Sequence, residues 1–323
     1  MIKRLFLGAL PFLLATACAQ APSRTPSMRA IRLPMGYIPN VQFAPIYVAA
    51  EKGYFREEGI DVSFDYKFET DGVALVGAGE IPFALVSGEQ VPLARAQGLP
   101  VVYTMAWWNG YPVAVTALQS SGIRTTQDLK GKKVGIPVLA GASYVGFRAL
   151  LNSAGMVEQD VTLAVIGYSQ VEALIAGTVD AVVVYANNEP VQLEMRGYKV
   201  NVIRVADFVN LASNGLLTNE KTIQNDPELV RAMIRAILRG VSDAVADPDA
   251  AYAACRKYVD GLAENDPVQK QVLAATMEFW RTDKPGRSDP AGWQNMDAIL
   301  RSMGLLTQPL DITKAFTNDF LPK

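Results

Sequence analysis

The sequence of 323 residues contains no histidine and only two cysteines. The absence of histidine excludes catalytic triads that depend on an imidazole base, and it excludes most transition-metal sites. Cys18 lies near the start and Cys255 lies in an expected helix, where a small buried residue is its simplest role, so no framework of disulfides is expected. The phosphate-binding pattern of Gly, four residues, Gly-Lys and Ser or Thr is also missing, so the chain carries no ATPase of that type.

The sequence also lacks an excess of charge of either sign. The 30 Lys and Arg residues nearly balance the 32 Asp and Glu residues, for a net charge of −2. This balance gives no basic footprint for nucleic acid, and that class of partner is excluded. Half of the residues are hydrophobic and 19% are charged, which is typical of a globular chain with one or two domains. After the first residues, no apolar run reaches the roughly 18 residues of a membrane helix.

The N-terminus has the pattern of an export signal. Lys3 and Arg4 precede an apolar run over residues 5–14, which is too short to span a bilayer comfortably. We therefore expect a signal peptide over residues 1–17 and an exported protein.

The sequence Ala-Thr-Ala-Cys ends this leader and resembles the box at which bacterial lipoproteins are cleaved before a lipid-modified cysteine. Alanine stands where leucine is commoner in that box. We expect lipidation of Cys18 and a tether over residues 18–27, rich in Ala, Pro and Ser, that holds the protein at a membrane face. The alternative is a plain secretory signal, cleaved after Ala17 or Ala19.

Residues 35–64 read as a strand end, a helix and a second strand. The strand covers residues 31–37, Asn40 is a helix N-cap candidate, and apolar residues then recur at helical spacing from Phe43. In open α/β sheets, ligands bind beyond the carboxyl ends of strands. An ordinary strand–helix unit without a ligand would have the same pattern. The candidate ligand-binding residues here are Tyr37, Asn40, Gln42 and Phe43.

The stretch GYIPNVQFAPIYVAAEKGYFREEGIDVSF is similar to the opening of a family of bacterial solute-binding proteins that serve ABC importers. This family includes binders of the thiamine pyrimidine precursor, of sulfonates, taurine and nitrate, and of riboflavin. Later segments resemble it in the same order, at residues 78–87, 129–155, 171–190 and from Phe316 onward. The family's fungal synthases use an active-site histidine and a cysteine cluster, and this sequence has neither.

The resemblance implies an α/β fold of the type II periplasmic-binding-protein class, with two lobes and two crossover strands as hinge. Lobe 1 would comprise residues 28–114 and 214–323, and lobe 2 residues 115–213. The protein would be a monomer that closes on a small molecule and delivers it to a membrane permease, powered by a separate ATPase. No catalysis, cofactor or metal is expected.

In lobe 1, Ser87 and Glu89 follow an expected buried strand and enter a helix, where backbone N–H groups are offered to a ligand. A carboxylate in the first helical turn also occurs without any ligand. Trp107 and Trp108 lie in an apolar stretch over residues 101–115, the expected first crossing between the lobes. Because adjacent residues of a strand point to opposite faces, we expect only one of these rings to face the cleft.

In lobe 2, polar and aromatic residues follow three expected strands, which end near residues 137, 166 and 185. Asparagine side chains both donate and accept hydrogen bonds, which suits a neutral ligand, although an Asn-rich turn is also common without one. The loop before the helix at residues 143–153 has no adjacent Lys or Arg, which disfavours an anionic ligand. The candidates are Ser143, Tyr144, Tyr168, Tyr185, Asn187, Asn188 and Glu189.

These candidates combine aromatic rings with amides and carboxylates and supply almost no cations. That chemistry favours a flat, neutral, nitrogen-rich ring, with riboflavin ahead of the thiamine pyrimidine precursor and both ahead of sulfonate, taurine or nitrate. Riboflavin would be the transported ligand and not a cofactor. The alternative from another class is a synthase or transferase on the same fold.

Overall fold

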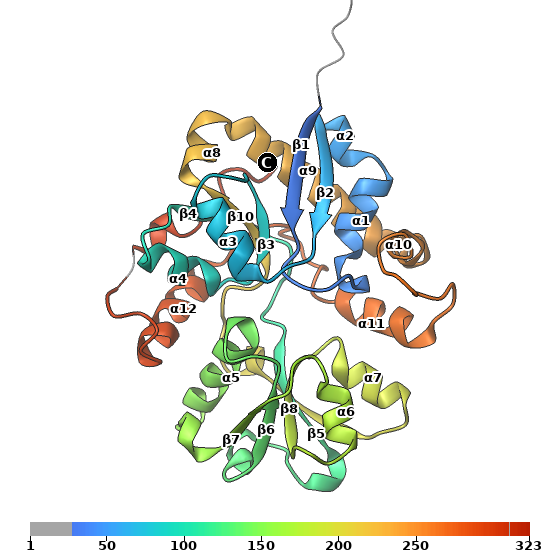
Figure 1. Ribbon diagram of the computed structural model, residues 1–323, viewed down its shortest axis with the longest axis vertical. Coiled ribbons are helices and arrows are strands. Elements are labelled where there is room, and N and C mark those ends of the chain that lie inside the picture. The colour runs from blue at the N-terminus through green and yellow to red at the C-terminus, as the bar shows by residue number, and fades with distance from the viewer. Residues whose placement is uncertain (1–27, 310) are drawn as a thin grey trace, which may run out of the picture.

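The computed structural model describes residues 28–309 and 311–323, which form two α/β lobes (Figure 1). The expected signal peptide, the tether and Cys18 lie outside the described residues. One lobe contains the described start of the chain and its C-terminus, and the other is built from the middle of the chain. Among the described residues, no helix is long and apolar enough to cross a membrane.

Lobe 1 contains a parallel pair of strands and an antiparallel group of three. In the pair, β1 (Arg29–Pro34) runs beside β2 (Ile60–Asp65). In the group, β10 (Gly215–Asn219) lies between β3 (Ala84–Val86) and β4 (Val101–Ala106), so a strand late in the sequence completes the lobe begun at its start. The lobe's helices are α1 (Ala44–Glu51), α2 (Tyr54–Glu57), α3 (Glu69–Gly77), α4 (Gln90–Ala96), α8 (Glu220–Asn225), α9 (Pro227–Ala246), α10 (Pro248–Cys255), α11 (Pro267–Met277) and α12 (Pro290–Ser302).

The long helix α9 shows why these residues form a helix and where it packs. The side chain of Asp226 accepts a hydrogen bond from the N–H of Leu229 and caps the helix, and Pro227 suits its first turn. Its buried face packs against α1. A Cβ atom at Gly240 would lie 2.1 Å from the carbonyl oxygen of Pro45, so only glycine allows this close approach.

The C-terminal residues complete lobe 1 at the edge of β4. The N–H of Tyr103 donates to the carbonyl of Ala315 at 2.8 Å, and the N–H of Thr317 donates to the carbonyl of Tyr103 at 2.9 Å. The ring of Phe316 between them stacks on Trp293 of α12, with ring centroids 5.2 Å apart. The C-terminal residues therefore pair with the edge of β4, the strand that leads into the first crossing.

Lobe 2 contains one sheet in the order β7–β6–β8–β5–β9. β6 runs parallel to β7 and β8, and β5 runs antiparallel to β8 and β9. The strands are β5 (Val113–Leu118), β6 (Lys133–Ile136), β7 (Thr162–Val165), β8 (Ala181–Tyr185) and β9 (Val200–Arg204). The helices α5 (Gly141–Ser153), α6 (Gln170–Ile175) and α7 (Glu189–Met195) lie around it (Figure 1). Helix α7 was not predicted: residues 186–188 turn, and Glu189 and Pro190 then begin the helix instead of closing the turn.

The chain passes between the lobes twice, at residues 107–112 (the first crossing) and 208–214 (the second crossing). The two crossings are bonded to each other, since the N–H groups of Trp107 and Trp108 both approach the carbonyl oxygen of Asn214, at 3.2 and 3.3 Å.

The crossings differ from the predicted pair of crossover strands, because each consists of irregular backbone between strands. Strand pairing stops at Ala106 and resumes at Val113. Gly110 has a φ of +84°, and Pro112 has no N–H to donate to a neighbouring strand, which explains the break. Val113 and Ala114 are paired within the sheet of lobe 2.

Candidate ligand-binding site

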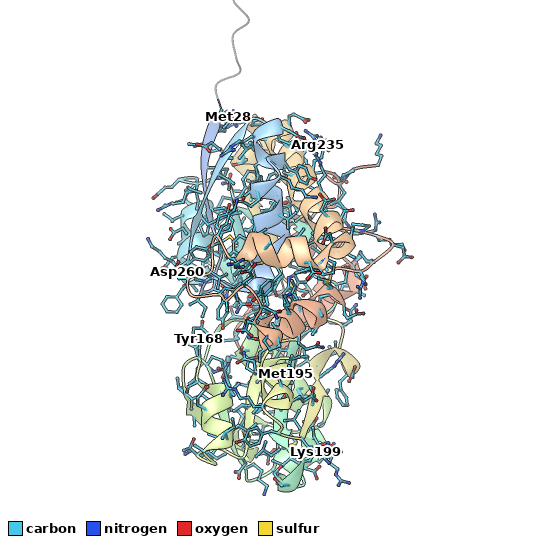
Figure 2. The ribbon with its side chains drawn as sticks, turned by 90° about the vertical axis from the view of Figure 1, so that its right-hand side faces the viewer. Met28, Tyr168, Met195, Lys199, Arg235 and Asp260 are labelled. Atoms are coloured by element: carbon cyan, nitrogen blue, oxygen red, sulfur yellow. The ribbon has the colours of Figure 1, made fainter. Side chains whose placement is uncertain are left out.

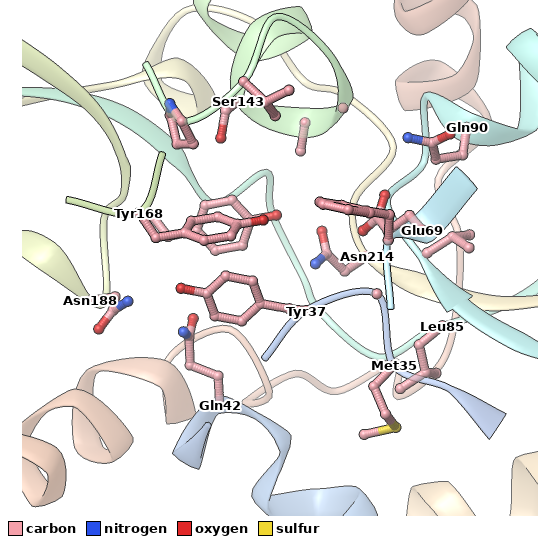
Figure 3. A pocket seen from close by; sticks show the side chains of 18 of the residues that line it. Met35, Tyr37, Gln42, Glu69, Leu85, Gln90, Ser143, Tyr168, Asn188 and Asn214 are labelled. Atoms are coloured by element: carbon pink, nitrogen blue, oxygen red, sulfur yellow. The ribbon is translucent and has the colours of Figure 1, made fainter. Parts of the chain in front are cut away.

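A cavity of about 370 Å³ lies between the lobes (Figure 3). Figure 2 shows Tyr168 at the level where the lobes meet. Both lobes and both crossings contribute to the cavity wall. The lining residues that the sequence analysis had proposed are Tyr37, Gln42, Phe43, Trp107, Trp108, Ser143, Tyr168, Tyr185, Asn188 and Glu189.

The other proposed residues do not line the cavity, and each makes structural contacts elsewhere. The side chain of Asn40 accepts from the N–H of Gln42 and caps the short helix before α1. The hydroxyl of Tyr144 donates to Glu158 at 2.6 Å inside lobe 2. Asn187 is buried and donates to both Gln42 and Thr276, at 2.8 Å each, which links lobe 2 to lobe 1.

Ser87 and Glu89 also lie behind the cavity wall and are fully buried. They contact the lining residue Glu69 through a chain of hydrogen bonds. These two residues therefore reach the cavity only through Glu69.

Aromatic rings form much of the wall. Phe43 stacks on Trp107 with centroids 5.9 Å apart, and Trp108 meets the edge of Tyr185 at 5.9 Å. Both tryptophans line the cavity, against the prediction that only one would, because β4 ends before them and strand alternation no longer applies.

Tyr37 of lobe 1 and Tyr168 of lobe 2 meet edge to face at 5.0 Å. These rings come from opposite lobes and lie side by side in the cavity (Figure 3). Their contact therefore depends on the distance between the lobes. Such pairs contribute about 0.5–1.5 kcal/mol beyond the burial of area.

Several buried polar atoms of the wall have no partner among the described residues. They are the indole nitrogens of Trp107 and Trp108 and the amide oxygen of Asn214. A buried polar group without a hydrogen bond is destabilising by about 1–3 kcal/mol, and these atoms have almost no accessible surface, so a bound molecule could reach them only if the wall moved.

The charged side chains of the cavity wall are carboxyls. Glu189 accepts hydrogen bonds from the N–H of Tyr185 at 3.0 Å and from the amide of Asn188 at 3.1 Å, yet burial raises its pKa to about 7. Glu69 lies on the side of the cavity away from Asn188 (Figure 3), and burial raises its pKa to about 7 as well.

No Lys or Arg appears among the described residues that line the cavity. Arg148, on the same helix α5 as the lining residues Gly141–Ser143, is paired with Glu158 at 2.6 Å. The site therefore has no positive side chain to balance an anion. Across residues 28–309 and 311–323, no cluster of acidic or cysteine side chains could hold a metal ion.

The family described as "NMT1/THI5 like" matches residues 40–251 of this chain. The chain belongs to this family. This result confirms the resemblance seen in the sequence, and the named relatives support a solute-binding protein.

The relatives of this NMT1/THI5-like chain include two named binding proteins. The riboflavin-binding protein RibY of Chloroflexus aurantiacus is 40% identical, over 99% of this chain and 98% of its own length. A formylaminopyrimidine-binding protein of Halalkalibacterium halodurans is 27% identical, over 94% of each chain. Among solved structures, the periplasmic aliphatic sulphonate-binding protein SsuA of Escherichia coli matches with a TM-score of 0.73 and 16% identity, over 89% of this chain and 97% of that one. The last match confirms the two-lobed fold and carries nothing on the ligand.

The sequence analysis missed several lining residues, among them Glu69, Phe68, Gln90 and Asn214. Glu69 begins α3, where an acidic residue is commonplace, so its type gave no signal. The position of its side chain depends on Gly36, a residue far away in the sequence. Asn214 could have been inferred, because it lies in the second crossing beside the strand that returns to lobe 1.

Proposed function

We propose that this solute-binding protein binds riboflavin in the cavity between its lobes. The observation that carries the proposal is the chemistry of the wall: stacked aromatic rings, and no cation among the described lining residues. A flat, neutral ring system matches that wall. The volume of about 370 Å³ falls within the range of about 300–1,000 Å³ of pockets that take small organic ligands. The relative of 40% identity that is named for riboflavin supports the same ligand.

Riboflavin carries the groups that this wall can satisfy. Its flat ring can stack against the aromatic side chains of the wall, among them Phe43 and Trp107. Its imide N–H is a donor that the Glu69 carboxylate can accept. Its ribityl hydroxyls suit amide groups such as those of Gln42 and Asn188, which lie at the end of the cavity away from Glu69 (Figure 3).

The biological role that we infer is capture of the vitamin for an ABC importer. The exported chain would be held at the membrane by a lipid on Cys18, act as a monomer and release its unchanged ligand to a permease with a separate ATPase. Ligand would favour the closed arrangement of the lobes by a population shift about the two crossings. No catalytic step is part of this role.

A formylaminopyrimidine or a related thiamine precursor is the second candidate. The carboxyls of Glu69 and Glu189 could accept an exocyclic amino group, and the relative of 27% identity is named for such a ligand. Sulfonate, taurine and nitrate are disfavoured, because each would bring an anionic group into a cavity whose ionisable lining residues include carboxyls and no Lys or Arg within the described chain. A pyrimidine synthase on this fold is the remaining alternative, and it would alter its ligand.

Calorimetric titration of the purified protein with riboflavin, formylaminopyrimidine, taurine and nitrate tests the proposal. We expect riboflavin to bind with micromolar or tighter affinity, about −8 kcal/mol or better, and to be recovered unchanged. Tyr168→Ala should weaken binding by about tenfold through the loss of a ring that lines the cavity. Tyr144→Phe is the matched control, since Tyr144 lies in the same lobe but outside the cavity, and it should bind as the wild type does. Binding of the aminopyrimidine without riboflavin would select the second candidate, and tight binding of taurine or nitrate would contradict both.

A further inference from the structure

The side chain of Ser87 lies between two carboxyl groups. Its Oγ is 2.5 Å from Oε2 of Glu69 and also hydrogen-bonds to Oε1 of Glu89. A serine hydroxyl has one proton and can donate to only one of these oxygens. The other contact is a hydrogen bond only if that carboxyl is protonated and donates to Oγ. The arrangement therefore requires at least one proton on the pair of carboxyls.

The surroundings of the two carboxyls place this proton on Glu89. Glu69 lines the cavity and accepts a second hydrogen bond from the N–H of Ser87 at 3.2 Å, which favours its ionised form. Glu89 is 0% exposed, and its Oε2 has no partner among the described residues. Gln90 supplies only a long contact to Oε1, at 3.5 Å. A buried carboxylate with an unpartnered oxygen is costly, whereas the neutral acid is not.

The charges around the pair agree with this assignment. The groups that act on Glu89 are Glu69 from α3, Ser87 before α4, Gln90 on α4 and the phenol of Tyr111 in the first crossing, with no Lys or Arg among them. Burial, and then repulsion by Glu69, raises the pKa of Glu89 to about 8. Burial raises the pKa of Glu69 to about 7.

We propose that Glu89 is a positioning residue that holds a proton for the ligand site. Its carboxylic acid donates to Ser87, which commits the Ser87 hydroxyl to Glu69. Glu69 then faces the cavity as a pure acceptor for an N–H donor of the ligand. This inference rests on the proposed function, in which that donor is the imide of riboflavin.

The proposal makes ligand binding sensitive to alkaline pH. When Glu89 loses its proton to solvent, two carboxylates compete for one hydroxyl proton and repel each other, so Glu69 is no longer held for the ligand. The nearby phenols do not titrate in this range, because burial raises the pKa of Tyr111 and Tyr185 further above 10. Glu69 and Glu189 each have a pKa of about 7, and both affect the acidic side of the profile.

Riboflavin titrations between about pH 6 and pH 9 test this inference, with the spectrum of the free ligand recorded in each buffer. Above the pKa of about 8, the affinity of the wild type should fall by about tenfold per pH unit. Glu89→Gln supplies a permanent amide donor to Ser87, so it should keep the affinity at pH 7 within about threefold and lose the alkaline fall. Glu80→Gln, at an exposed carboxylate of the same lobe, is the matched control and should keep that fall. An alkaline fall that persists unchanged in Glu89→Gln, or one that is missing from the wild type, overturns the proposal.

A readout without ligand separates this inference from the proposed function. Because the pKa of Glu89 is raised in the folded state, the folded protein binds more protons than the unfolded chain, and stability should fall as pH rises from about 6 to about 9. The thermal unfolding midpoint of the wild type should drop over this range by more than that of Glu89→Gln. Equal drops would overturn the inference even if riboflavin binds. If riboflavin failed to bind at any pH but the two unfolding midpoints still dropped by different amounts, the proposed ligand would be refuted and the protonation of Glu89 would stand.

Discussion

Replacement of Gly36 by alanine should disrupt the ligand site from a residue that has no functional group. Gly36 has a φ of +75°, and a Cβ atom there would lie 2.6 Å from Cγ of Glu69 and 3.2 Å from the carbonyl oxygen of Leu85. The left-handed backbone costs an alanine roughly 1–2 kcal/mol. Glu69 must also move, which breaks its hydrogen bonds with Ser87, worth about 0.5–1.5 kcal/mol each.

The total loss for Gly36→Ala is therefore roughly 2–5 kcal/mol of unfolding free energy. Urea denaturation followed by tryptophan fluorescence measures it. Gly53→Ala is the matched control: Gly53 has a φ of +77° in the same lobe, and nothing lies within 4 Å of its added Cβ. It should lose only the backbone part, roughly 1–2 kcal/mol. The difference between the two variants isolates the displacement of Glu69.

Ligand titration completes the test. Gly36→Ala should weaken riboflavin binding by at least about tenfold, or 1.4 kcal/mol, because Glu69 no longer lines the cavity in the same position. Gly53→Ala should bind as the wild type does. If Gly36→Ala lost no more stability than Gly53→Ala and bound riboflavin normally, the inferred role of Glu69 as a positioned acceptor would be refuted.

Three further expectations follow from single contacts. Asn187→Ala removes the hydrogen bonds to Gln42 and Thr276 that join the lobes, so ligand affinity should fall by about 1–3 kcal/mol in calorimetry and the ligand-bound protein should be less compact in small-angle scattering. Glu189 has a folded-state pKa raised to about 7, so its contribution to the free energy of unfolding should decline by roughly 3 kcal/mol as the pH rises from 4.5 to 7 and beyond. Urea denaturation at several pH values measures this decline, and Glu189→Gln should reduce it. Cys18→Ala should move the protein from the membrane fraction to the soluble fraction, whereas an unmodified N-terminus beginning at alanine in the native protein, found by mass spectrometry, would contradict lipidation.

Most of the fold could be predicted from local patterns. The strands β6 and β8 end close to residues 137 and 185 as expected, and α5 covers the helix expected at residues 143–153. The break in the first crossing depended on Gly110 and Pro112 acting together inside an otherwise strand-like aromatic stretch, so propensity alone indicated a continuous strand. Helix α7 was missed because its polar start has the composition of a turn.

The site was predicted less completely, since its geometry depends on contacts between distant segments. Residues at strand ends, such as Tyr37 and Tyr185, were found because the α/β topology brings those ends to one cleft. Glu69 was missed because its position is set by Gly36, and Tyr144 turned away because Glu158 offers it a partner within its own lobe. The local sequence indicates the position of neither side chain.

The crossings carry a consequence for how such a protein can change in evolution. Trp107, Trp108 and Asn214 form part of the cavity wall, and the same residues hold the two crossings together. In the proposed role, a substitution that adapts this wall to a new solute would also alter the hinge about which the lobes open. Substitutions at these positions during evolution would therefore change ligand selectivity and the rate of ligand release together.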